Sequence, residues 1–459
     1  MLLISVTYGN IDVHNCLRNV VSLFHHIEKE IAWRKARGHD VGFETLLKNK
    51  PVVAVGPDHP LMDEMLMADY FHGNDGLGGI SDSVSTVSTS THYIAVIDNS
   101  QHPHMSPADT WKGLFSSTSD PEHEALQREA QSPTLFRPSR VEGHKEILNL
   151  LKDNEPDTIT IVAIGPLTNL AIAAAEDPET FLRVKEVVSM GGNIYEPGNV
   201  KPSPIAANAA AAIHEPPFRL IKQPPGPFRD ALTSRNQITP VAEFNVFADS
   251  VAAARVYTLS SPNPHTTMPP TPPAPPGVQP GQAPPPFLQP YPKKLSRKLK
   301  ATLFPLDITN KHVLTRGEYR KAMEPLLAAG SPLAEWTNAW LSSTFTKMEA
   351  LQDDVTGDAV GLQLHDPLCI WYCITQDDPK WKLAKDEDIR IETSGQWTRG
   401  MCVIDQRSRL KMGDELGDEV AGDHGKWLNG AAGNRLGRCI QSPGQDVFGT
   451  YILKKVFGV

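Results

Sequence analysis

The chain has 459 residues and a formal net charge of −9, with 40% hydrophobic and 21% charged residues. This composition permits a large buried core, and an acidic balance without a long basic block argues against nucleic-acid binding. The five cysteines form no CxxC pair, so neither a disulfide framework nor a thiolate zinc site is indicated. No apolar run reaches transmembrane length and no signal peptide is recognisable, so we expect a soluble, cytoplasmic protein without membrane contact.

The N-terminal part of the chain alternates apolar strands with a helix. Residues 2–6 and 51–56 are short apolar runs typical of buried strands. Between them, Asp12 is suited to cap a helix, and apolar residues recur at helical spacing over 13–31. Buried strands joined by a helix predict a parallel sheet.

The same alternation continues toward the C-terminus. Apolar periodicity predicts helices over 142–152, 168–175, 249–257, 316–329, 332–351 and 446–457, and strands over 158–164, 186–190, 306–308, 389–392 and 401–404. We therefore predict an α/β fold with an open, mostly parallel sheet flanked by helices, in a single domain of residues 1–459.

Three long segments interrupt this pattern and are interpreted as insertions. They cover about 81–138, 200–237 and 261–292. The first begins with a Ser/Thr-rich stretch, and the third is dense in Pro-Pro pairs that favour polyproline II over a packed core. One alternative function follows from the third segment, since Pro-rich stretches bind SH3-type domains.

The stretch Leu364-His365-Asp366-Pro367-Leu368 stands at the start of an apolar run. Proline suits the first turn of a helix and Asp is favoured just before it, so Asp366 is predicted to cap a helix with His365 beside it. On these residues alone, capping explains Asp366 better than a functional site does. A glycine-dense loop over 72–79 lacks the GxGxxG pattern of a dinucleotide site, but its His72 and Asp75 are candidates to line a pocket.

A series of short motifs spans most of the chain. They are YGN at 8–10, HGNDGLGG at 72–79, AIGPLTNLA at 163–171, MGG at 190–192, PGN at 197–199, VAEFN at 241–245, PLDIT at 305–309, LHDPL at 364–368 and TRGMCVID at 398–405. In this order they resemble the inosine-uridine preferring nucleoside hydrolase family, in the style of its fungal members. The resemblance implies an open α/β sheet with a calcium ion at the strand ends, and hydrolysis of the N-glycosidic bond of ribonucleosides to ribose and free base.

The resemblance also implies roles for individual residues. Asp366 would be a Ca²⁺ ligand and ribose contact, and Ile164 would offer its backbone carbonyl to the metal. His365 would stand near the leaving base as a proton donor, with His72 near the same end. A histidine with its ordinary pKa near neutrality suits this work. The ribose hydroxyls, sugar and base would be contacted by Asn10, Asn199, Glu243, Asn245 and Phe244.

The chemistry explains why these residue types would be needed. Departure of the base leaves an oxocarbenium-like ribose, so the site must hold the sugar hydroxyls and supply an activated water. Calcium prefers several hard oxygen ligands and orients such a water. The partner would be a small-molecule ribonucleoside, and a homo-oligomer is compatible with the resemblance.

Two departures from the family pattern qualify this expectation. The N-terminal DTDxGxDD motif, which supplies calcium ligands and the catalytic base, has no match here. We therefore expect a domain that lacks its first strand and helix. Residues 200–237 also separate the PGN and VAEFN motifs, which nearly adjoin in the family. A catalytically inactive relative that still binds nucleoside or ribose is the main alternative.

Overall fold

The fold is built on two sheets whose strands are mostly parallel. The computed structural model describes residues 1–80, 109–115, 134–199, 240–270, 285–351, 355–407 and 421–458. One sheet is parallel and has the order β1-β2-β3. The other has the order β4-β5-β6-β12-β9, in which only β9 runs antiparallel to its neighbour. The strands are β1 (Leu3–Val6), β2 (Val52–Val55), β3 (Arg137–Pro138), β4 (Thr160–Ala163), β5 (Glu186–Met190), β6 (Ala301–Phe304), β9 (Lys382–Glu387) and β12 (Leu436–Gln441).

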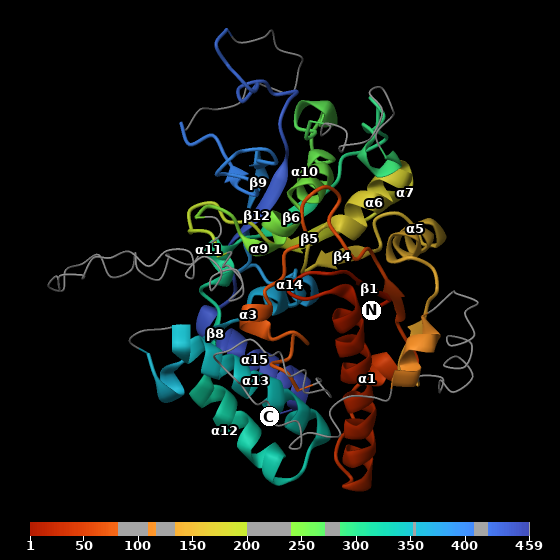
Figure 1. The fold of residues 1–459 in the computed structure, drawn as a ribbon, viewed down its shortest axis with the longest axis vertical. Helices are drawn as coiled ribbons and strands as arrows, with labels where there is room; N and C mark the ends of the chain where they lie inside the picture. The colour runs from red at the N-terminus through yellow and green to blue at the C-terminus, as the bar shows by residue number, and fades with distance from the viewer. Residues whose placement is uncertain are drawn as a thin grey trace, which may run out of the picture.

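Helices lie on both sides of these sheets and form a second layer below them in the view of Figure 1. The longer ones are α1 (Val13–Ala36), α5 (Gly143–Asp153), α6 (Thr168–Glu176), α10 (Ser250–Thr258), α12 (Arg316–Ala328), α13 (Pro332–Leu351), α14 (His365–Ile374) and α15 (Gln445–Phe457). Short helices are α2 (Glu44–Lys48), α3 (Asp69–His72), α7 (Pro178–Phe181), α9 (Phe244–Ala248) and α11 (Leu306–Thr309). Two small antiparallel pairs join β7 (Val313–Thr315) to β8 (Gly361–Gln363) and β10 (Arg390–Ile391) to β11 (Cys402–Val403). The predicted open, mostly parallel α/β fold is confirmed.

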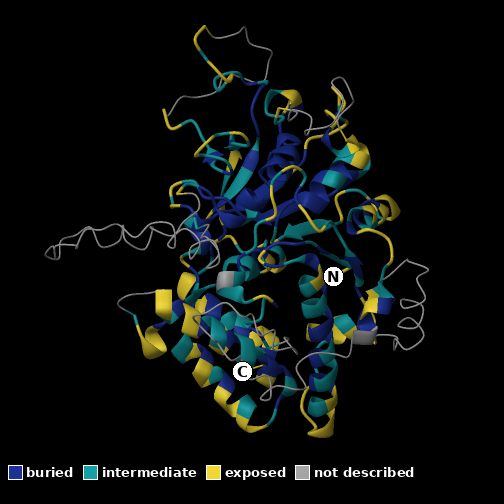
Figure 2. Ribbon diagram, in the orientation of Figure 1, coloured by how far each residue is buried: buried dark blue, intermediate teal, exposed yellow. Residues whose placement is uncertain are grey.

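Helix α1 shows how local sequence sets these elements. The Asp12 side chain accepts hydrogen bonds from the backbone N–H groups of His14 and Asn15 at 2.9 and 3.0 Å, which satisfies donors at the helix start. An apolar stripe faces the core and includes the buried Leu17 and Phe24. The predicted cap and helix are therefore confirmed. Figure 2 shows a similar division across the molecule: strands β5 and β6 are buried, whereas the lower helices carry exposed residues on their outer faces.

Two local predictions are wrong. Residues 306–308 belong to helix α11, and the strand is β6, immediately before Pro305. The apolar run of β6 is fully buried between β5 and β12, whereas proline lacks an N–H and favours the start of a helical turn. Asp366 does not cap its helix, because α14 already begins at His365 and Leu364 occupies the cap position. Asp366 therefore lies in the first turn.

The ends of two predicted insertions belong to the fold. Strand β3 pairs with β2, and Leu135 and Phe136 are buried, so the segment predicted over 81–138 returns to the sheet before its expected end. After the Pro-rich stretch, Arg255 of α10 donates hydrogen bonds to the carbonyl oxygens of Leu288 and Gln289 at 3.2 and 2.8 Å. The segment predicted over 261–292 is thus anchored at its end.

Most of the first insertion and all of residues 200–237 lie outside the described residues. The division into one domain with three insertions stays a prediction for them. In the described part of the chain, no helix is both long and apolar enough to cross a membrane.

Candidate functional site

A cavity of about 1040 Å³ opens where several parallel strands end. Its wall draws on the loops after β1, β4 and β5 and on the starts of α9 and α14. Carboxyl ends of parallel strands are where open α/β sheets place their ligands. Every residue singled out by the family resemblance lines this one cavity: Asn10, His72, Ile164, Asn199, Glu243, Phe244, Asn245, His365 and Asp366. Their individual roles stay predictions.

Glu243 is held rigidly by the backbone around it. Its carboxylate accepts hydrogen bonds from the N–H groups of Gly192, Asn245 and Val246 at 2.8, 2.8 and 3.1 Å, so it caps α9. The side chain is only 2% exposed, and burial raises its pKa to about 7. Since a carboxylate offers about four acceptor positions, little capacity remains for a ribose hydroxyl.

The two asparagines also organise the loop. The Asn199 side-chain oxygen accepts a hydrogen bond from the Phe244 N–H at 2.8 Å, and the Asn245 amide donates to the Met190 carbonyl at 3.2 Å. The Asn199 N–H donates to the Ala242 carbonyl at 3.2 Å. The PGN and VAEFN motifs are therefore adjacent in space, although about forty residues separate them in sequence.

Asp366 faces the cavity without a competing backbone role. Burial, and then the charge of Glu243, raise the pKa of Asp366 to about 7. A bound cation or hydroxyl donor next to Asp366 would favour its ionised form. Ile164 lies at the end of β4 with 47% of its surface exposed, so its carbonyl belongs to an accessible loop.

The residues present do not fit a complete calcium site. Calcium takes about six to eight oxygen ligands, whereas the described residues contain no group of three or more His, Cys, Asp or Glu placed to hold a metal. Glu243 already binds three N–H groups, which leaves the Asp366 carboxylate and the Ile164 carbonyl as the protein ligands of the predicted set.

The histidines of the cavity are neutral at physiological pH. Burial lowers the pKa of both His365 and His72 to about 4. This corrects the expectation that His365 titrates near neutrality. Its Nδ1 lies 2.8 Å from the Thr309 hydroxyl. When that hydroxyl donates, the remaining ring proton resides on Nε2, so His365 can still donate a hydrogen bond as a neutral imidazole.

Asp75, the other candidate of the glycine-dense loop, has a structural role. It is fully buried, and its carboxylate accepts hydrogen bonds from the N–H groups of Leu77 and Gly79 at 2.9 and 2.7 Å. It does not line the cavity. Its contacts shape the loop that presents His72.

One buried network behind the site was not anticipated. The Asp249 carboxylate accepts hydrogen bonds from the Thr168 hydroxyl at 2.7 Å and the Leu61 N–H at 3.0 Å, and Thr168 in turn contacts the Tyr8 hydroxyl at 3.0 Å. It ties the loop after β1 to α6 and α10. No sequence signal pointed to this network, because Asp249 was only the first residue of the helix predicted over 249–257; in the structure it caps α10.

Comparison with known proteins identifies the family of the chain. The family model described as inosine-uridine preferring nucleoside hydrolase matches residues 1–212 and 226–421. An uncharacterized protein of Schizosaccharomyces pombe is 28% identical over 280 residues, covering 60% of this chain and 62% of that protein. An inosine-uridine preferring nucleoside hydrolase of Leishmania major is 26% identical over 261 residues, covering 57% and 54%. These alignments span less than two thirds of either relative.

A solved structure supports the fold. The structure of an inosine-guanosine nucleoside hydrolase superposes with a TM-score of 0.54 at 16% identity, over 99% of this chain and 90% of that one. The family model, in contrast, matches most of the sequence directly. The chain therefore belongs to the inosine-uridine preferring nucleoside hydrolase family.

Proposed function

We propose that the cavity of this chain serves the hydrolysis of the N-glycosidic bond of ribonucleosides, which releases ribose and the free base. The proposal rests on one observation: residues that match the family motifs are far apart in sequence but line one cavity at the ends of β1, β4 and β5. The substrate is a small molecule, and its sugar is the part that these residues suit.

The polar side chains match what the reaction demands. Ribose hydroxyls need acceptors and donors, which Asn10, Asn245 and Asp366 of the cavity lining would offer. Loss of the base leaves positive charge on the sugar, which the ionised carboxylate of Asp366 in the cavity wall would stabilise. Neutral His365 would donate a hydrogen bond to the departing base.

The family is known to use metal ions, and we propose calcium for this site. The chain would contribute the Asp366 carboxylate and the Ile164 carbonyl, and the remaining ligands would be water or groups outside the described residues. This shortage favours a second candidate function, which is binding of nucleoside or ribose without turnover.

We also propose a cytoplasmic location. All five cysteines are free thiols, and Cys369, Cys402 and Cys439 are buried, as suits a reducing compartment.

A reducing-sugar assay with inosine and uridine, with and without calcium, tests the proposal. We expect calcium-dependent ribose release, slower than that of the Leishmania major relative measured in parallel, because this sequence has no match to DTDxGxDD and general base catalysis is worth about 10²–10⁴-fold. Ribose binding without release, measured by isothermal titration, would select the second candidate. Binding of neither ribose nor nucleoside would overturn both.

A further inference from the structure

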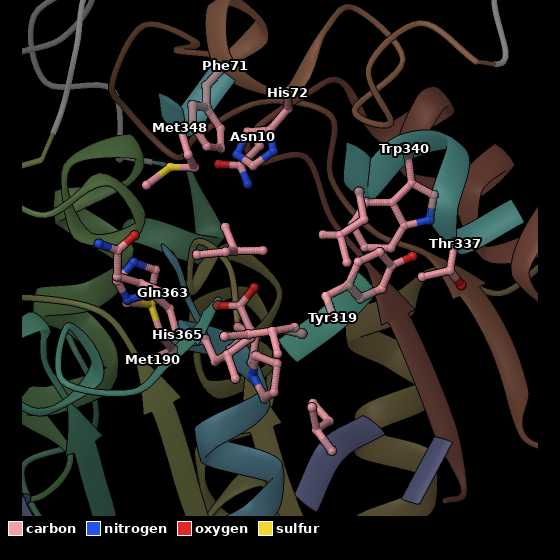
Figure 3. Close-up of a pocket in the computed structure, with 18 of the residues that line it drawn as sticks. Asn10, Phe71, His72, Met190, Tyr319, Thr337, Trp340, Met348, Gln363 and His365 are labelled. Carbon is pink, nitrogen blue, oxygen red and sulfur yellow. The ribbon is translucent and has the colours of Figure 1, made fainter. Parts of the chain in front are cut away.

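One side-chain contact in the cavity wall bears on how His365 meets a ligand. Figure 3 shows His365 on the same side of the open space as Met190 and Gln363. The His365 Nδ1 lies 2.8 Å from the hydroxyl oxygen of Thr309, a residue that is fully buried. Among the described residues, neither this hydroxyl nor the Nε2 of the ring has another hydrogen-bond partner. The contact therefore decides which ring nitrogen carries the proton.

The direction of this hydrogen bond follows from the hydrogen atoms of the two groups. A hydroxyl has one hydrogen, and a neutral imidazole has one ring proton, on either Nδ1 or Nε2. If Nδ1 donated its proton to Thr309, the hydroxyl hydrogen would be buried with no acceptor in the part of the chain that the structure describes. A buried donor without an acceptor is costly. Donation from the hydroxyl to Nδ1 avoids that cost and leaves the ring proton of His365 on Nε2.

Another buried histidine, His312, has the opposite arrangement. Its Nδ1 lies 2.9 Å from the carbonyl oxygen of Ile308, which can only accept a hydrogen bond, so the neutral ring carries its proton on Nδ1. The Nε2 of His312 then accepts a hydrogen bond from the Ser442 hydroxyl at 2.7 Å. The partner of Nδ1 therefore decides the tautomer of each ring, and the two histidines are expected to differ.

Thr309 is held in place by the backbone of α11 and of the residues that follow it. Its N–H donates to the Pro305 carbonyl at 3.1 Å, and its carbonyl accepts a hydrogen bond from the His312 N–H at 3.1 Å. The His312 carbonyl in turn accepts from the N–H of Leu364 at 2.8 Å, immediately before His365. These bonds tie α11 to the start of α14, so the hydroxyl and the imidazole are oriented before a ligand binds.

We propose that Thr309 is a positioning residue for His365: its hydroxyl donates to Nδ1, holds the ring in one orientation and leaves the Nε2–H group as the donor to a ligand in the cavity. The consequence for the reaction rests on the proposed function, because a base that receives a hydrogen bond departs more readily. The tautomer itself is a property of the free protein and is measured without substrate.

Nitrogen NMR of the full chain with isotope-labelled histidine rings measures the tautomer at about pH 8, above the ordinary pKa of imidazole. His365→Ala assigns the resonances, and we expect a protonated Nε2 and an unprotonated Nδ1 that accepts a hydrogen bond. Thr309→Val removes the hydroxyl with little change of shape and should move the Nδ1 resonance toward that of a nitrogen without a donor. Thr309→Ser keeps the hydroxyl and should not. A protonated Nδ1 in the wild type, or an Nδ1 resonance unchanged by Thr309→Val, would overturn the proposal.

Ser442→Ala is the matched control, because it removes a buried hydroxyl that is hydrogen bonded to a different histidine and that does not line the cavity. It should alter the Nε2 resonance of His312 and leave the resonances of His365 unchanged. Thermal melts establish that each variant is folded. Resonances of His365 that move as far in Ser442→Ala as in Thr309→Val would show a general effect of packing and would also reject the proposal.

Two substrates with different leaving groups test the consequence for the reaction. The base of inosine benefits from a donated hydrogen bond, whereas para-nitrophenyl ribofuranoside releases a stable nitrophenolate that needs none. Thr309→Val should lower kcat for inosine by about tenfold or more, change KM by less than about threefold, and leave both constants for the nitrophenyl substrate within about threefold. Thr309→Ser should restore kcat for inosine. An equal loss with both substrates would contradict the positioning role.

The outcome is separable from that of the proposed function. If the wild type releases no ribose from either substrate, the hydrolase is rejected, and the NMR resonances alone uphold or overturn the assignment of Thr309 as the donor to His365. Ribose release from inosine that is unaffected by Thr309→Val would uphold the hydrolase and reject the positioning role.

Discussion

At the scale of single residues, the environment of His365 departs most from what its residue type suggests. The ring lies in a buried wall of the cavity next to the Thr309 hydroxyl, and burial lowers its pKa to about 4. A role as a protonated acid near pH 7 would therefore need a compensating charge from a ligand. Donation of a hydrogen bond by the neutral imidazole needs no such compensating charge.

The protonation state of His365 can be measured directly. We expect its imidazole proton resonances to titrate with a midpoint about 2 pH units below an ordinary histidine. Comparison of spectra with those of His365→Ala assigns the signal. A midpoint near the ordinary value would show that the ring is solvated.

A second prediction for a single residue concerns the role of Asp366 in calcium binding. We expect the chain to bind calcium weakly, with a dissociation constant of about 10⁻⁴ M or higher, because few protein oxygens converge at the site. Asp366→Ala should abolish the calorimetric signal, while Asp58→Asn, at an exposed carboxylate, should leave it unchanged. An unaltered calcium affinity in Asp366→Ala would refute the assignment of Asp366 as a ligand.

At the scale of elements, the buried carboxyl of Asp249 couples α10 to its neighbours. It is fully buried, and burial raises its pKa to about 6. The pKa is higher in the folded state than in the unfolded state. The stability that it contributes is therefore complete below pH about 4 and is lost as the pH rises through about 6.

Asp249→Asn removes this titration. We expect the variant to be less stable at low pH by about 1–3 kcal/mol, because the Leu61 N–H loses its acceptor. The gap to the wild type should narrow as the pH rises from about 4 to about 7. Thermal melts across this pH range measure the stability difference between the variant and the wild type. Asp358→Asn, at an exposed carboxylate, is the control. A gap that stays constant with pH would contradict the raised pKa.

At the scale of the whole molecule, the segment 200–237 separates two parts of one loop. The Asn199 N–H reaches the Ala242 carbonyl at 3.2 Å, so both ends of the intervening chain leave from the same place. Loop closure costs only about 0.6 kcal/mol for each doubling of length. A long excursion there is therefore compatible with an intact site.

Deletion of residues 200–237 should leave the melting temperature unchanged or raise it, since the joined ends already meet. Differential scanning calorimetry of the deleted and full chains makes the comparison. A melting temperature clearly below that of the full chain would mean that the segment contributes packing to the fold.

Short-range sequence patterns were sufficient for many elements of this molecule. Asp12 and the apolar stripe of α1 predicted that helix, and the apolar runs at 2–6, 51–56 and 186–190 predicted strands that the structure contains. Such signals are local, because a cap or a periodicity is complete within a few residues. The motif positions likewise predicted which side chains would meet at the strand ends.

Tertiary structure decided the rest. Strand β12 has a mixed polar pattern and was not predicted, because its pairing with β6 and β9 joins residues distant in sequence. The hydrogen bond from the Gly192 N–H to the Glu243 carboxylate joins residues far apart in sequence, and the burial that lowers the pKa of His365 likewise depends on the packed fold. Residue types therefore determined the kind of site, while burial and packing determined its protonation state, its remaining hydrogen-bond capacity and its shape.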